Sequence, residues 1–228
     1  MTGREPTSAD VAAAILREVR ELARATAPTV RAVRRRYSRM VAGESADFVL
    51  AIARCLLREN SWSARVVAFE LLDGHDAARR RLRGGAVEEM AAGLSDWGSV
   101  DLFGVTIAGP AWREGRISDR HVMRWARSKD RWRRRLSLVA TVPLNSRARG
   151  GAGDPARTLA VCRLLADDRD DMVVKALSWA LRELSKRDAG CVKEFLRTED
   201  ECLAARVRRE VRAKLETGRK VRPRRPED

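Results

Sequence analysis

The chain has 228 residues, which is enough for one large domain or two small ones with a buried core. Lysine and arginine number 47 against 32 aspartates and glutamates, so the formal net charge is +15 and the pI is about 11.0. Such a charge predicts a polyanionic partner, although an arginine-rich, GC-biased genome could give the same composition without a binding role.

The cysteines and histidines exclude a structural zinc site. None of the cysteines forms a CxxC pair and the chain has only two histidines, so we expect no metal and no other cofactor. Widely spaced cysteines are typical of small buried hydrophobes in a reducing cytoplasm. The residues concerned are Cys55, Cys162, Cys191, Cys202, His75 and His121.

The sequence predicts neither export nor insertion into a membrane. The first ten residues lack a charged-then-apolar signal pattern, and no apolar run approaches the length that spans a bilayer. We therefore expect a soluble, monomeric protein of the cytoplasm, associated with the nucleoid in a prokaryote, with no membrane partner.

The first half of the chain is predicted to be helical, because alanine, leucine, arginine and glutamate dominate and β-branched alternation is scarce. A helix begins near Ser8 or Asp10, Ser45 is the expected N-cap of the third helix, and Gly74 closes the fourth. The expected helices cover residues 11–25, 29–40, 45–60, 62–74 and 85–94.

The second half, after Gly109–Pro110, is also predicted to be helical. Ser118 and Asp130 are expected caps. Pro143–Pro155 is the only long glycine-rich loop in the sequence, and a flexible connection between repeats is one interpretation of it. The expected helices cover residues 118–129, 130–142, 156–167, 170–186, 189–199 and 201–216, and a basic tail over 218–228 is predicted to be disordered.

Helix pairs recur at intervals of about forty residues, the period of HEAT-like repeats. We therefore predict an all-α fold in which about six helix pairs over residues 1–217 form one domain, a curved α-solenoid with a basic concave face. The alternative is an all-α domain without repeats.

The stretch LSDWGSVDLFG places Trp97 one helical turn before Asp101, with Ser95 or Asp96 as the cap. An indole face beside a carboxylate is a good environment for a cation. The alternative is a tryptophan packed on a neighbouring helix and an aspartate paired with an arginine.

Two further helices combine tryptophan with basic residues. In KDRWRRRLSLVA, Arg135 borders the apolar stripe, which suits an arginine held in place for a phosphate, whereas Arg131, Arg133 and Arg134 can face water or phosphate. In VVKALSWALRELSK, Trp179 lies on the polar row rather than on the apolar row. The alternatives are a solvated basic face for the first and a packing wedge for the second.

The C-terminal run Arg206–Arg225 holds ten basic residues and two acidic ones. Its arginines could bind a DNA backbone without sequence preference, and solvated charge is the alternative.

Four stretches, SDWGSVDLF, WARSKDRWRRRLSLVA, DDMVVKALSWALRELSK and RVRREVRAKL, together resemble the HEAT-like DNA alkylation repair glycosylases, the AlkD family. The similarity extends roughly from Pro28 to Leu215 and is strong from Leu94 onward. The Trp-x-x-x-Asp spacing and the KALxWALRE helix make the signal specific in combination.

The resemblance implies roles for individual residues. The family's site tryptophans and essential aspartate fall on Trp97, Trp179 and Asp101, which are the expected catalytic residues. The arginine beside the lesion strand falls on Arg135, and we expect further DNA contacts from Arg134, Lys175 and Arg182.

The resemblance also implies a reaction, the hydrolysis of the N-glycosidic bond of cationic N3- or N7-alkylated purines in duplex DNA. A cationic base leaves without protonation, which fits a site without histidine, and no deep base-flipping pocket is needed, so bulky adducts would be tolerated. The alternatives are a non-catalytic module that binds damaged or unusual DNA and a scaffold for an acidic protein.

Overall fold

The computed structural model describes residues 5–220, which are helical and contain no strand. The side chains of Ser45, Asp96 and Asp130 cap helices as predicted, each accepting a hydrogen bond from a backbone N–H in the first helical turn. Ser118 lies at the predicted N-cap of α9, but its side chain forms no cap hydrogen bond. The helices divide into two compact units, which meet in sequence between Ala111 and Trp112.

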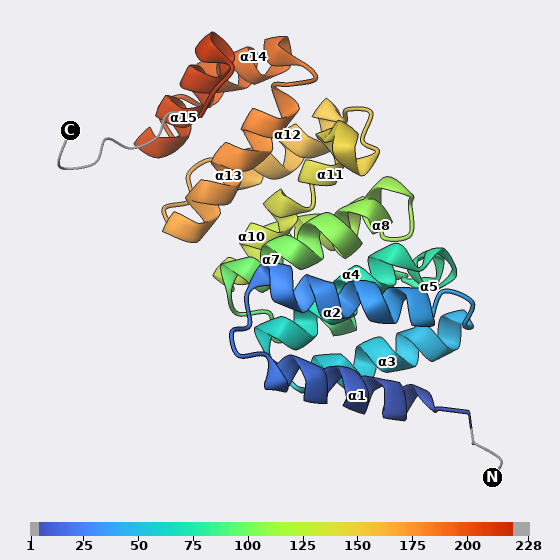
Figure 1. The fold of residues 1–228 in the computed structure, drawn as a ribbon. Helices are drawn as coiled ribbons and strands as arrows, with labels where there is room; N and C mark the ends of the chain where they lie inside the picture. The colour runs from blue at the N-terminus through green and yellow to red at the C-terminus, as the bar shows by residue number, and fades with distance from the viewer. Residues whose placement is uncertain (1–4, 221–228) are drawn as a thin grey trace. The chain divides into compact units, whose positions relative to one another are not determined.

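The first unit is built from pairwise packing of successive helices. Helix α3 packs against α4 and α1, α2 packs against α4, and α4 also contacts α7 (Figure 1). Its core includes Phe69 and Phe103, whose ring centroids lie 5.0 Å apart. Its elements are α1 (Ser8–Glu21), α2 (Ala27–Met40), α3 (Ala46–Arg58), α4 (Trp62–Gly74), α5 (Asp76–Arg81), α6 (Gly84–Ala91), α7 (Trp97–Phe103), a π-helix (Gly104–Ala108) and the start of α8 (Gly109–Arg113).

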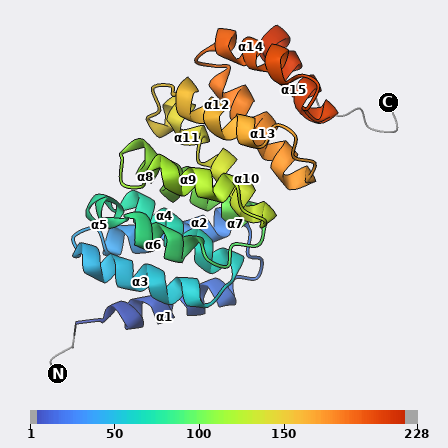
Figure 2. The ribbon, with the colours of Figure 1, turned by 180° about the vertical axis from the view of Figure 1, so that it is seen from behind.

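The second unit repeats this style of packing. Helix α13 lies between α10 and α15, and α9 and α12 pack around α10 (Figure 2). Its elements are α9 (Asp119–Ala126), α10 (Arg131–Val139), α11 (Val142–Asn145), a 3-10 turn (Arg147–Arg149), α12 (Pro155–Leu164), α13 (Asp171–Leu184), α14 (Ala189–Glu199) and α15 (Ala205–Thr217). The neighbour-to-neighbour packing in each unit confirms the predicted all-α fold with HEAT-like helical repeats.

Helix α5 is missing from the sequence prediction. It begins after His75, whose Nδ1 accepts a hydrogen bond from the Ala78 N–H at 3.2 Å. Sequence reasoning missed this start because histidine is not among the residues that usually cap helices.

The glycine-rich segment Pro143–Pro155 contains most of α11 and the 3-10 turn, and arginines of other elements hold its backbone. The Arg113 guanidinium donates to the Pro143 carbonyl at 3.2 Å, and Arg187 donates to the carbonyls of Asn145 and Gly151. A Cβ at Gly151 would overlap the Pro143 carbonyl oxygen, so only glycine fits there.

The cysteines depart from the expectation of four buried hydrophobes. Cys162 is buried, whereas Cys55, Cys191 and Cys202 are half-buried, and all four are free thiols. The predicted tail begins at Gly218, and its residues 221–228 lie outside the described residues. Among residues 5–220, no helix combines the length and the apolar character that a membrane span requires.

Candidate functional site

Helix α7 presents an exposed indole and, one turn later, a half-buried carboxylate. Asp96 caps the helix by accepting the Ser99 N–H at 2.8 Å, so Trp97 is the first helical residue. The Trp97 side chain is 61% exposed, Asp101 is half-buried, and Ser99 on the opposite side of the helix is buried. The predicted helix start and the shared Trp97–Asp101 face are thus present in the structure.

A buried arginine of α4 forms hydrogen bonds with the start of α7. Arg65 of α4 is only 6% exposed, and its guanidinium donates to the Asp96 carboxylate at 3.2 Å, the Ser99 hydroxyl at 3.3 Å and the Gly93 carbonyl at 2.9 Å. It also donates to the amide oxygen of Asn60. Because one rigid guanidinium joins the cap and the first turn of α7, the backbone that carries Trp97 is fixed in place.

In the second unit, Arg135 is held where α10 packs on α13. It is 6% exposed and donates a hydrogen bond to the Met172 carbonyl. The neighbouring Arg134 is partly buried, and its Nε lies 2.6 Å from an Asp168 carboxylate oxygen. Both guanidinium groups are therefore fixed by protein contacts, as expected for Arg135 but not foreseen for Arg134.

Helix α13 carries Trp179 beside an arginine oriented by buried polar groups. Trp179 is half-buried, and Arg182 donates to the Ser178 hydroxyl at 3.2 Å, which in turn donates to buried Glu210 at 2.6 Å. Burial lowers the pKa of Arg182 below its ordinary value, and the nearby Glu210 carboxylate opposes only part of that shift. Lys175 of the same helix pairs with Asp171 at 2.6 Å.

The sequence-predicted site residues thus fall into two groups. Trp97 and Asp101 lie together on α7 in the first unit. The second unit brings together α10 and α13, which carry Arg134, Arg135, Lys175, Trp179 and Arg182.

Comparison with known proteins identifies the kind of protein that carries these two groups. The family model described as DNA alkylation repair enzyme matches residues 2–215. The chain belongs to the DNA alkylation repair enzyme family. No curated protein and no solved structure matches it. The family implies an interaction with DNA, to which an excess of positive charge is suited.

In this DNA alkylation repair family member, the helix of Asp101 continues without a break into a π-helix. Pro110 lacks the N–H that an α-helix would use at this position, and its ring would press on the preceding turn. The wider π turn accommodates Pro110, and the Thr106 hydroxyl donates to the Leu102 carbonyl at 2.7 Å. Such π segments are frequent at functional sites.

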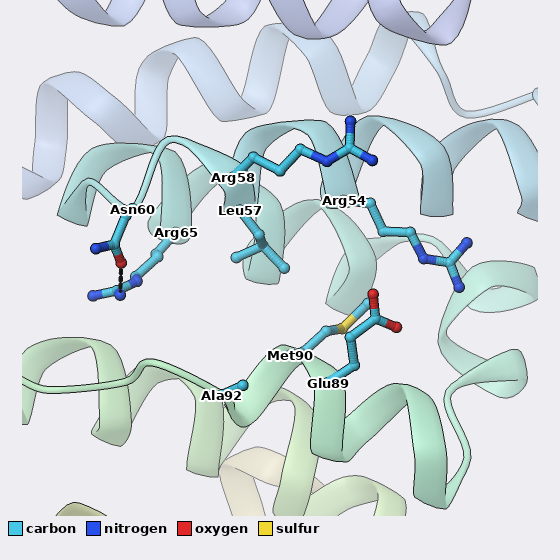
Figure 3. Close-up of a pocket in the computed structure, with 8 residues that line it drawn as sticks. All are labelled: Arg54, Leu57, Arg58, Asn60, Arg65, Glu89, Met90 and Ala92. Carbon is cyan, nitrogen blue, oxygen red and sulfur yellow. Dashed lines mark hydrogen bonds between the residues drawn. The ribbon is translucent and has the colours of Figure 1, made fainter.

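Arg65 and Asn60 also line a pocket of about 200 Å³ (Figure 3). Arg54 and Arg58 of α3 line one side, and Glu89 and Met90 of α6 line the other. Within residues 5–220, no group of three or more histidines, cysteines or carboxylates is arranged to hold a metal ion. The pocket presents the exposed guanidinium groups of Arg54 and Arg58 beside the apolar side chain of Met90. The carboxylate of Glu89 offsets one of these positive charges.

Proposed function

We propose that this family member is a DNA glycosylase that hydrolyses the N-glycosidic bond of cationic N3- or N7-alkylated purines in duplex DNA. It would act without a deep base-flipping pocket, on bulky adducts as well as methyl groups, and so perform the first step of base excision repair. The observation that supports this most is the exposed Trp97 indole one turn from the half-buried Asp101, on a helix that buried Arg65 holds in place.

The chemistry follows from the charge of the substrate. Alkylation at N3 or N7 makes the purine cationic, so it takes the bonding electrons and leaves as a neutral base without an acid to protonate it. Positive charge then develops on the deoxyribose, where a carboxylate and an indole face stabilise it. Asp101 orients a water whose oxygen bonds to C1′ and accepts the proton that this water loses.

The second unit supplies contacts to the same duplex in this proposal. A buried, hydrogen-bonded guanidinium such as that of Arg135 loses little entropy when it binds a phosphate. Arg182 gains the same advantage from Ser178 and Glu210, and Trp179 adds an indole beside it. Arg134 and Lys175 contact the phosphate backbone of the DNA in this proposal. Residues 1–217 then act as one DNA-binding domain, and the protein acts as a monomer.

The test is the rate of base release from a duplex with one N7-methylguanine, measured under single-turnover conditions. Asp101→Asn should lose most of the rate and keep the affinity for DNA. The matched control is Asp47→Asn, which removes a carboxylate of the same unit that is exposed on α3 and pairs with Arg81. If Asp101→Asn released the base as fast as Asp47→Asn does, the catalytic assignment would be wrong.

A non-catalytic module that binds damaged or unusual DNA is the second candidate. The net charge of +15 supports it as well, because binding to phosphates needs no Asp101. Salt-sensitive binding of the duplex without release of a base would favour this function over the first.

A further inference from the structure

A second exposed tryptophan lies beside the start of α7. Trp62 is the first residue of α4, as Trp97 is the first residue of α7, and the two helices pack against each other. The exposed fractions of the two residues are 37% for Trp62 and 61% for Trp97. By contrast, Trp112 and Trp125 are buried in the core of the second unit.

The Trp62 indole lies beside Gly98 of α7. A Cβ at position 98 would lie 3.4 Å from the Trp62 Nε1, at the limit of ordinary contact, and 3.3 Å from an Asp96 carboxylate oxygen. The indole therefore rests against the backbone of the residue that follows Trp97. We call Trp62, Gly98 and Trp97 together the indole edge.

The polar end of Trp62 is unused by the protein. Among residues 5–220, its indole N–H forms no hydrogen bond with another residue. Packing does not require a tryptophan at a position this exposed, and tryptophan usually places its N–H against a partner. An exposed indole with a spare donor is suited to a ligand that offers both an apolar face and an acceptor.

The chain beside Trp62 adds positive charge. Asn60, two residues earlier, lines the same pocket as Arg54 and Arg58 (Figure 3). Both arginines are exposed, and neither forms an ion pair within the described part of the chain. A polyanion that crosses the indole edge would thus meet two exposed guanidinium groups of α3, whose charge Glu89 across the pocket only partly offsets.

We propose that Trp62 is a DNA-contacting residue of the same site as Trp97 and Asp101. Its ring lies against a deoxyribose of the bound strand, and its N–H donates to a phosphate oxygen of that strand. Gly98, which has no side chain, leaves room for the ring beside α7. The inference rests on the proposed glycosylase function for the identity of the DNA, and it assigns Trp62 to binding rather than to bond cleavage.

The test measures binding and cleavage separately. Affinity for a duplex with one N7-methylguanine is measured in the Asp101→Asn background, where turnover is suppressed, and single-turnover base release is measured in the otherwise unchanged chain. Trp62→Ala should weaken binding about tenfold. Trp62→Phe, which keeps a ring without the N–H, should recover part of that loss. Base release at subsaturating protein should slow by the same factor as the loss of affinity, because the substitution weakens binding of the DNA.

Met40→Ala is the matched control, since Met40 is an exposed large hydrophobic residue of the same unit at the end of α2. The proposal is overturned if Trp62→Ala binds DNA as tightly as Met40→Ala does. If Trp62→Ala unfolds, Trp62→Gln, which removes the ring and keeps a long side chain, decides, and binding equal to the Met40→Ala control overturns the proposal again. The glycosylase function fails on a different result, no release of base by the wild-type protein, so the two failures are distinguishable.

Discussion

Replacing Arg65 with alanine tests whether the guanidinium beneath α7 holds the candidate site together. The substitution removes four hydrogen bonds, and their acceptors on Asn60, Gly93, Asp96 and Ser99 lose a buried donor. Breaking a buried ion pair costs about 3–5 kcal/mol. Because the Asp96 side chain is 43% exposed and water can reach it, the lower end, about 3 kcal/mol, applies.

This free energy predicts a measurable change in melting temperature. A loss of 1 kcal/mol lowers the melting temperature of a protein of this size by about 2–4 °C, so Arg65→Ala should melt about 6–12 °C lower. Thermal unfolding followed by far-UV circular dichroism measures the shift. Base release should also fall, because the first turn of α7, which carries Trp97, loses its anchor.

Two variants sharpen the measurement. Arg65→Lys should lie between the wild type and Arg65→Ala, since a single ammonium cannot replace the fork of a guanidinium. Arg54→Ala removes an exposed arginine of the same unit and should change the stability by less than about 0.5 kcal/mol. If Arg65→Ala and Arg54→Ala melted at the same temperature, the role assigned to the Arg65 network would be refuted.

Three other predictions follow from burial and charge. Trp97→Ala should cost less than about 1 kcal/mol of stability because the Trp97 side chain is exposed, whereas Trp112→Ala should cost about 3–5 kcal/mol because Trp112 is buried. Equal melting temperatures of the two variants would contradict the assignment of Trp97 to the surface and Trp112 to the core. Glu210→Ala should cost about 2 kcal/mol and weaken DNA binding by freeing Arg182, so unchanged affinity would argue against an oriented Arg182. Burial and Asp188 raise the pKa of Cys191 to about 11, so its alkylation by iodoacetamide, followed by peptide mass spectrometry, should still accelerate above pH 9 rather than level off.

Local features of the fold could be predicted from the sequence. The caps at Ser45, Asp96 and Asp130 depend on groups within a few residues, and the spacing of Trp97 and Asp101 on one face needs only the helical period. The family resemblance then assigned chemistry to residues whose spacing alone favoured no single role.

Features that depend on distant contacts could not be predicted. Arg65 appears in the sequence as a charged residue within an apolar run, and its partners Asp96 and Ser99 lie 31 and 34 residues away. Trp62 likewise looks like an ordinary helix start until Gly98 of another helix is seen beside it. In both cases the informative signal is a residue at odds with its surroundings, a buried arginine and an exposed tryptophan.

The identity of the product tests the central claim most directly. A duplex that contains one N7-methylguanine is incubated with the protein. The products are separated by chromatography and identified by mass spectrometry. A glycosylase that uses Asp101 should release the intact neutral base N7-methylguanine and leave an abasic site in the strand. Recovery of an intact, still alkylated strand under conditions where the protein binds it would contradict the proposed activity.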